Sequence, residues 1–166
     1  MRTGGRILVD QLALQGAGAA YLVPGESFLA VLDALFDSTA VRTIVCRHEG
    51  GAAMMAEAAG RLTGRRGIAF VTRAPGATNA ASGVYVAAQG QTPMILFVGL
   101  PPRARAHLTA FQDLDLAGLY GGMAKHVEIA SAAARLPETV SRAYAIALNG
   151  RPGPVVIGLP EDVLSE

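Results

Sequence analysis

The fold is decided by residues 43–57, which read TIVCRHEGGAAMMAE. The first four residues are apolar or β-branched and predict a buried strand, and the Ala-rich run after Glu49 predicts a helix. Glu49 is therefore expected at the carboxyl end of a strand and in the first turn of the following helix. Ligands of open α/β sheets bind in the crevice beyond the carboxyl ends of the strands. This placement makes Glu49 the first candidate for a functional residue.

The same alternation of strand and helix runs through the rest of the chain. Single helices between strands indicate parallel pairing, because a crossover between parallel strands needs a helix. We therefore predict a three-layer α/β/α domain, residues 1–166, around a six-stranded parallel sheet. The expected strands are residues 21–23, 41–46, 67–72, 93–98, 125–129 and 154–159, and the expected helices are 3–17, 28–36, 48–63, 77–88 and 132–148.

Composition restricts the class of protein. The 166 residues carry 14 basic and 13 acidic side chains, a net charge of +1, with no basic stripe, which argues against a nucleic-acid or membrane partner. Apolar runs are shorter than a membrane span and no signal-peptide core is apparent, so a cytoplasmic location is expected. The single cysteine, Cys46, excludes an internal disulfide and is expected in the core, as are Met54, Met55 and Met94. No metal-ligand cluster is predicted, and His107 and His126 are expected at the surface or at a strand end.

Short motifs in a fixed order give the chain a family resemblance. It resembles the N-terminal, pyrimidine-binding domain of thiamine-diphosphate-dependent enzymes of the acetolactate synthase group, whose fold is flavodoxin-like. Ala74 and Gly50 depart from the Gly and Gln common in that group, which leaves the substrate unassigned. The matching motifs are VPG (23–25), RHE (47–49), MAE (55–57), PGATN (75–79), TPMI (92–95), VG (98–99), AFQD (110–113), KH (125–126), GPV (153–155) and LPEDV (159–163).

The resemblance implies roles for particular residues. Glu49 would hydrogen-bond N1′ of the cofactor's aminopyrimidine ring and so activate thiamine diphosphate. Gly25, Pro75 and Asn79 would line the cofactor side, with Asn79 capping or lining the turn at residues 75–79. Phe111 and Gln112 would lie on the substrate side. From the residues alone, the alternative for Glu49 is a carboxylate that interacts with first-turn amides, and the alternative for residues 75–79 is a plain strand-to-helix turn.

The resemblance also implies parts outside the chain. In the family, Mg²⁺ and the diphosphate are held by a further domain through a Gly-Asp-Gly motif, which residues 1–166 lack, and some members bind FAD through a middle domain. We therefore expect a homodimer or larger homo-oligomer that decarboxylates a 2-keto acid and transfers the acyl group to a second carbonyl. The isolated domain would be inactive. Two alternatives remain at this point: a natural subunit of a split 2-keto-acid decarboxylase, and a non-catalytic flavodoxin-like binding module.

Overall fold

A computed structural model describes residues 2–106 and 110–166, and its centre is a sheet of six parallel strands. The strand order is β2-β1-β3-β4-β6-β5. This confirms the predicted six-stranded parallel sheet, and His107 lies outside the described residues. The strands are β1 Ala19–Leu22, β2 Arg42–Val45, β3 Gly67–Thr72, β4 Met94–Leu100, β5 His126–Ile129 and β6 Pro154–Pro160.

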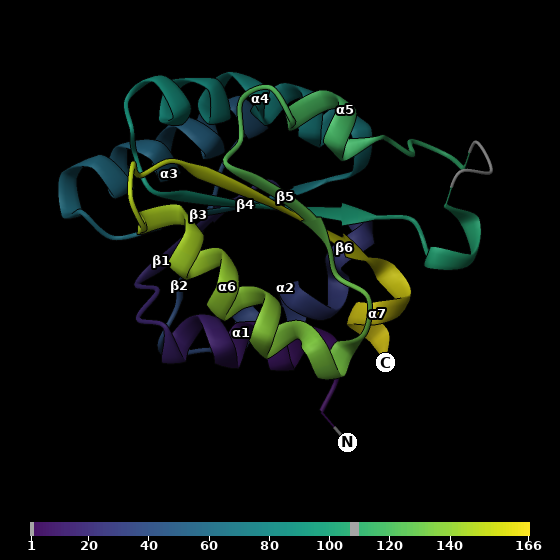
Figure 1. Ribbon diagram of the computed structural model, residues 1–166. Coiled ribbons are helices and arrows are strands. Elements are labelled where there is room, and N and C mark those ends of the chain that lie inside the picture. The colour runs from purple at the N-terminus through teal and green to yellow at the C-terminus, as the bar shows by residue number, and fades with distance from the viewer. Residues whose placement is uncertain (1, 107–109) are drawn as a thin grey trace.

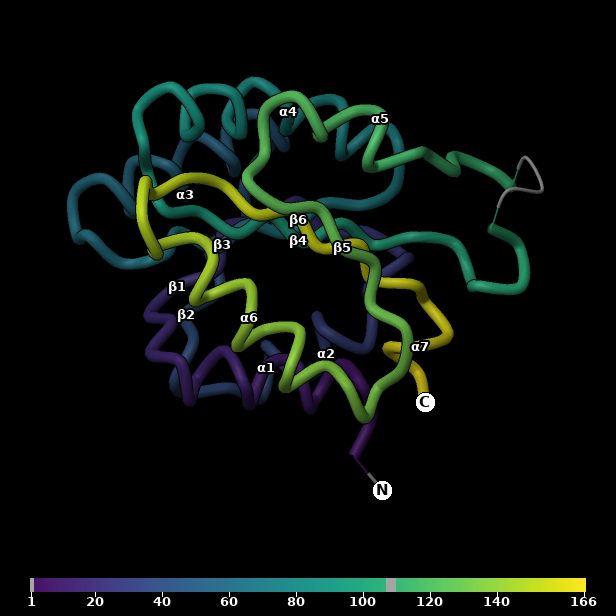
Figure 2. Tube along the Cα trace, in the orientation of Figure 1, coloured from purple at the N-terminus to yellow at the C-terminus, as the bar shows by residue number. Residues whose placement is uncertain are grey.

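Helices cover both faces of the sheet, which confirms the three-layer arrangement (Figure 1). Helices α1, α2, α6 and α7 lie on one face and α3, α4 and α5 on the other, and each layer closes its own apolar core against the sheet. The two termini lie on the same side of the molecule (Figure 2). The helices are α1 Gly4–Leu14, α2 Leu29–Phe36, α3 Glu49–Thr63, α4 Arg73–Gln89, α5 Leu116–Tyr120, α6 Leu136–Leu148 and α7 Glu161–Ser165, with short 3-10 turns η1 Glu26–Phe28, η2 Arg103–Arg105 and η3 Ala133–Arg135.

The strands differ in burial according to their place in the sheet. Strands β4 and β6 are buried along their whole length, as unbroken apolar runs in parallel sheets usually are. Strand β2, by contrast, is an edge strand, and the Val45 side chain is 64% exposed. The prediction that residues 43–46 form a buried strand was therefore wrong. Cys46, expected in the core, is only partly buried for the same reason.

Small residues allow α3 and α4 to pack closely together. A Cβ atom at Gly83 of α4 would lie 2.4 Å from the Cβ of Ala53 on α3, a distance that no side chain could tolerate. Only one face of α3 is used in this contact, so Met54 and Met55 are 38% and 44% exposed rather than core residues as predicted. Met94 of β4 is fully buried, as expected.

Helix α4 begins earlier than the sequence indicated. It follows β3 directly at Arg73, so residues 75–79 lie within its first two turns and do not form a separate turn. Pro75 is tolerated there because the first-turn N–H groups have no partner within the helix. Among residues 2–106 and 110–166, no helix combines the length and hydropathy needed to cross a bilayer.

Candidate functional site

Glu49 is the first residue of α3 and lies at the end of the chain segment that leaves β2. The preceding residue, His48, caps the helix: its Nδ1 accepts a hydrogen bond of 3.1 Å from the Gly50 amide. Because His48 caps the helix, the Glu49 carboxylate does not accept the capping hydrogen bond from the Gly50 amide. It accepts instead a 2.9 Å bond from Nδ2 of Asn79, which donates to Oε2. No other hydrogen bond or ion pair to this carboxylate is formed within the described residues.

Asn79 reaches Glu49 because α3 and α4 start side by side. A Cβ at Gly50 would lie 3.1 Å from the backbone oxygen of Asn79, so the two helices touch at this level. Asn79 lies in the second turn of α4 and does not cap the helix, which corrects one of its two predicted roles. The contact joins two βα units, and the sequence resemblance had assigned both residues to the cofactor side.

The chain reverses its direction across the sheet between β1 and β3. From β1 it passes to the edge strand β2, and then returns to β3 on the other side of β1. A reversal of this kind opens a crevice at the carboxyl ends of the two strands, where such sheets bind ligands. Gly25 follows β1, and Arg73 follows β3. The predicted cofactor-side residues therefore cluster at the end of the sheet where a ligand is expected.

Gly25 has a packing role that the structure explains. Its backbone is extended, and a Cβ would lie 2.4 Å from the Cβ of Thr72 at the end of β3. The Thr72 hydroxyl also shares a hydrogen bond with the buried Ser27 hydroxyl. Glycine is therefore needed to bring the loop after β1 against β3. Whether the same backbone also contacts a ligand stays a prediction.

Phe111 and Gln112 belong to a loop that returns to the start of α4. The backbone oxygen of Gln112 accepts a 3.0 Å bond from the Ala74 amide, and that of Phe111 accepts a 3.2 Å bond from Nη1 of Arg73. The Phe111 side chain is 71% exposed. Sequence reasoning missed Arg73, although a basic residue immediately after the apolar strand at residues 67–72 was a usable signal.

One described cavity lies away from Glu49. It has a volume of about 330 Å³ at the carboxyl ends of β4, β5 and β6, and its lining includes none of the predicted site residues. Its polar groups include Arg103, whose guanidinium is bonded to Asp162 and Glu166. The parts of the chain that the structure describes contain no group of three or more His, Cys, Asp or Glu side chains placed to hold a metal.

The donor set around Glu49 fits an aminopyrimidine ring. A carboxylate with a free oxygen can share a proton with a ring nitrogen, and the described partner of Glu49 is a neutral amide and not a cation. Asn79 donates to Oε2 of Glu49, and within the described residues Oε1 has no hydrogen-bond donor. Oε1 could therefore accept a bond from a ligand. The chemistry of the site is thus that of a hydrogen-bonding acid and not of an ion pair.

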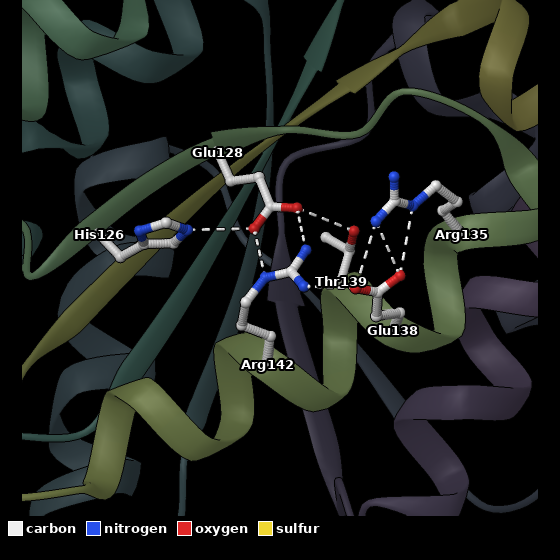
Figure 3. Close-up of polar contacts among 6 residues, drawn as sticks. All are labelled: His126, Glu128, Arg135, Glu138, Thr139 and Arg142. Carbon is white, nitrogen blue, oxygen red and sulfur yellow. Dashed lines mark hydrogen bonds and ion pairs between the residues drawn. The ribbon is translucent and has the colours of Figure 1, made fainter.

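Glu128 on β5 shows the opposite arrangement (Figure 3). Its carboxylate accepts bonds of 2.6 and 3.0 Å from Arg142, 3.0 Å from Thr139, and a 3.0 Å contact with Nε2 of His126. Burial raises the pKa of Glu128, but the bonds from Arg142, His126 and Thr139 outweigh burial and lower it to about 2. This cluster fastens the edge strand to α6, where Arg142 also bonds Glu138.

Comparisons with known proteins identify relatives of the chain. Residues 2–119 match the family described as "Thiamine pyrophosphate enzyme, N-terminal TPP binding domain". The mitochondrial catalytic subunit of acetolactate synthase from Aspergillus candidus is 39% identical over 98% of this chain and 23% of its own length. The large subunits of acetolactate synthase isozymes 1 and 3 from Escherichia coli are 37% and 33% identical over 97% and 99% of this chain, each over 29% of its own length. The chain thus spans about a quarter of the length of the curated relatives it matches.

Proposed function

The chain belongs to the family of thiamine pyrophosphate enzymes, as their N-terminal TPP-binding domain, and we propose that it serves an acetolactate-synthase-like reaction. In this proposal the complete enzyme decarboxylates a 2-keto acid and transfers the resulting acyl-anion equivalent to a second carbonyl. This chain would bind the aminopyrimidine side of thiamine diphosphate. The particular keto acid and acceptor are left open.

The observation that carries the proposal is the state of the Glu49 carboxylate. It lies beyond the carboxyl end of β2, the side of the sheet where such folds usually bind ligands, and within the described residues it is bonded only to the Asn79 amide at 2.9 Å. An acid without a cationic partner can hold a proton on a ring nitrogen, and such a bond is strong where water is excluded. Glu49 would therefore act as the catalytic acid that activates the cofactor at N1′.

The remaining candidates would orient the groups that react. Asn79 would hold the Glu49 carboxylate in one rotamer, while Gly25 and Pro75 would line the ring. Phe111 and Gln112 would face the 2-keto acid. When bound, thiamine diphosphate supplies the nucleophilic carbon that adds to the keto group and lets carbon dioxide leave, so the protein's task is binding, orientation and exclusion of water.

The proposal assigns the other components to parts outside this chain. Mg²⁺ and the diphosphate would be held by a separate domain, in the same polypeptide or in a second one, and FAD would be an optional cofactor of the complete enzyme. The isolated chain would be inactive. A reading frame that continues past residue 166 would support one long enzyme, and a separate neighbouring frame for the second domain would support a split one. We place the enzyme in the cytoplasm.

A second copy of the chain is the proposed partner. Apolar side chains are exposed on neighbouring elements of one region: Val45 on β2, Met54 and Met55 on α3, and Tyr85 on α4. Clustered exposed apolar side chains often mark a protein interface. A homodimer or larger homo-oligomer would bury them close to Glu49 and so remove water from the acid.

The test is an amide substitution in the complete enzyme supplied with thiamine diphosphate and Mg²⁺. Glu49→Gln should lower pyruvate decarboxylation and carboligation by about 10²- to 10⁴-fold, the usual contribution of a positioned acid. Glu138→Gln is the matched control, because Glu138 is a carboxylate of α6 that bonds Arg135 and Arg142 instead of a site residue. Full activity in Glu49→Gln would refute the assignment. Absence of any thiamine diphosphate binding by the wild type would favour a non-catalytic module.

A further inference from the structure

Three residues other than glycine adopt a left-handed backbone within the described chain. They are Arg73 with φ of 47°, Gln91 with φ of 54° and Gln112 with φ of 60°. Such a conformation costs roughly 1–2 kcal/mol in a side-chain-bearing residue and gathers at functional positions. Arg73 and Gln112 are 39 positions apart in sequence. They are nevertheless close in space, because Ala74, the neighbour of Arg73, is hydrogen-bonded to Gln112.

Two hydrogen bonds make this junction. The Ala74 amide donates to the Gln112 oxygen at 3.0 Å, and Nη1 of Arg73 donates to the Phe111 oxygen at 3.2 Å. The loop closes locally as well, since the Asp113 amide donates to the Ala110 oxygen at 3.0 Å. Residues 110–113 are thus attached to the first turn of α4 at two successive peptide groups.

The Arg73 side chain crosses the carboxyl ends of the strands and is held from both sides. Its Nη2 lies 3.6 Å from an oxygen of Glu26, after β1, and 3.4 Å from an oxygen of Glu161, after β6. The side chain is only 12% exposed, and its buried Nε has no acceptor among residues 2–106 and 110–166. A buried donor without a partner is costly. Both the backbone and the side chain of Arg73 are therefore kept at the expense of stability.

We infer that Arg73 is a positioning residue that holds the Phe111–Gln112 segment in register with Glu49. The connection is continuous: Glu49 bonds Asn79 on α4, and the start of the same helix bonds Gln112 through Ala74 and Phe111 through Arg73. Helix α4 thereby sets the distance between the cofactor-side acid and the substrate-side residues. The inference rests on the proposed function, because that function makes Phe111 and Gln112 substrate-side residues. The two hydrogen bonds that attach them to α4 are observed independently of any function.

The decisive variant is Arg73→Gly in the complete enzyme. Glycine accepts the left-handed backbone, so the substitution removes the guanidinium without adding backbone strain. Gln91→Gly is the matched control, because it also places glycine at a left-handed position, just beyond the far end of α4. Arg73→Lys is the conservative variant, which keeps one donor for the Phe111 oxygen and loses the planar fork.

Two measurements judge the variants. Hydrogen exchange of peptides covering residues 110–114 reports the attachment, and KM for pyruvate against Kd for thiamine diphosphate reports its consequence. We expect Arg73→Gly to accelerate exchange and to raise KM by at least about tenfold each, with the Kd for thiamine diphosphate changed by less than about twofold. Arg73→Lys should lie in between, and Gln91→Gly should match the wild type.

Unchanged exchange in Arg73→Gly would overturn the inference, and so would faster exchange with an unchanged KM. An equal loss of cofactor affinity would also overturn it, because the effect would then not be confined to the substrate side. If the wild type turned over no 2-keto acid, the proposed function would fail, while the exchange measurement would still decide whether Arg73 holds the segment.

Discussion

Two glutamates near opposite edges of the sheet show how a carboxylate becomes structural or stays available. Glu128 lies on the edge strand β5, and Glu49 follows the other edge strand, β2. Both are partly buried. Glu128 is bonded by Arg142, Thr139 and His126, whereas the described contacts of Glu49 reduce to one neutral amide, that of Asn79.

The difference shows that the partners, and not burial, separate the two roles. A carboxylate bonded by a guanidinium, a hydroxyl and an imidazole has no acceptor position left for a ligand, and its charge is balanced in place. Such an acid contributes to stability. Glu49 keeps an oxygen for a further donor and has no cation within ion-pair distance among the described residues, so it can serve chemistry.

The largest expected effect comes from converting each acid to its amide. Glu49→Gln should cost about 10²- to 10⁴-fold in kcat with little change in the free energy of unfolding. Glu128→Gln should leave kcat unchanged and lower the free energy of unfolding by about 2 kcal/mol, because the Arg142 contact loses its charge. Steady-state kinetics and urea unfolding of both variants check this. Equal losses of activity in the two variants would contradict the assignment of Glu49 to catalysis and Glu128 to stability.

The second effect is the pH dependence of stability caused by Glu128. Its pKa is lowered from 4.5 to about 2 in the folded protein. The ionised side chain therefore contributes fully to the free energy of unfolding above about pH 4.5, and this contribution is lost as the pH falls through about 2. The stability difference between wild type and Glu128→Gln should thus shrink from about 2 kcal/mol at pH 6 toward zero near pH 2. Urea midpoints over that range measure it, and a constant difference would contradict the assigned cause.

The third effect concerns the single partner of Glu49. Asn79→Ala should lower kcat/KM by about tenfold, because the carboxylate loses the donor that fixes its rotamer. Gln89→Ala removes a similar amide from the exposed end of the same helix and is the control. Kinetic constants for the two variants decide the point. Equal activity in Asn79→Ala and the wild type would show that Glu49 is held by something else.

The smallest effect comes from backbone strain, which also separates the two regions. Gln112→Gly and Gln91→Gly should each stabilise the fold by up to about 1 kcal/mol, because glycine adopts positive φ without penalty. Only Gln112→Gly should reduce activity. Thermal unfolding and turnover of the two variants measure this. Loss of stability in both would contradict the claim that the positive φ angles of Gln91 and Gln112 destabilise the fold.

Much of this arrangement could be predicted from local sequence. The apolar runs of β3, β4 and β6 are buried strands, and the position of Glu49 between a strand and a helix is correct. Exposure was harder to predict. Strand β2 has the composition of a buried strand, but it lies at the sheet edge, and Met54 and Met55 lie on the uncovered side of α3. Hydropathy describes what a side chain prefers and not which neighbours the fold provides.

The start of α4 was misjudged for a related reason. Pro75 and Gly76 indicate a turn in isolation, yet the first turn of a helix tolerates proline, and a bond from Ala74 to Gln112 supports the backbone there. Arg73 was missed because its significance lies in contacts with Glu26, Phe111 and Glu161, which are distant along the chain.

The sequence by itself determined the alternation of strands and helices, the three-layer class and the family motifs, because these depend on residues close together in the chain. Only the tertiary structure decided that the strands next to the two glutamates are the edges of the sheet, that Asn79 is the partner of Glu49, and that Arg73 bonds the Phe111–Gln112 segment. Those contacts join separate βα units, which the strand order and the packing of α3 against α4 bring together.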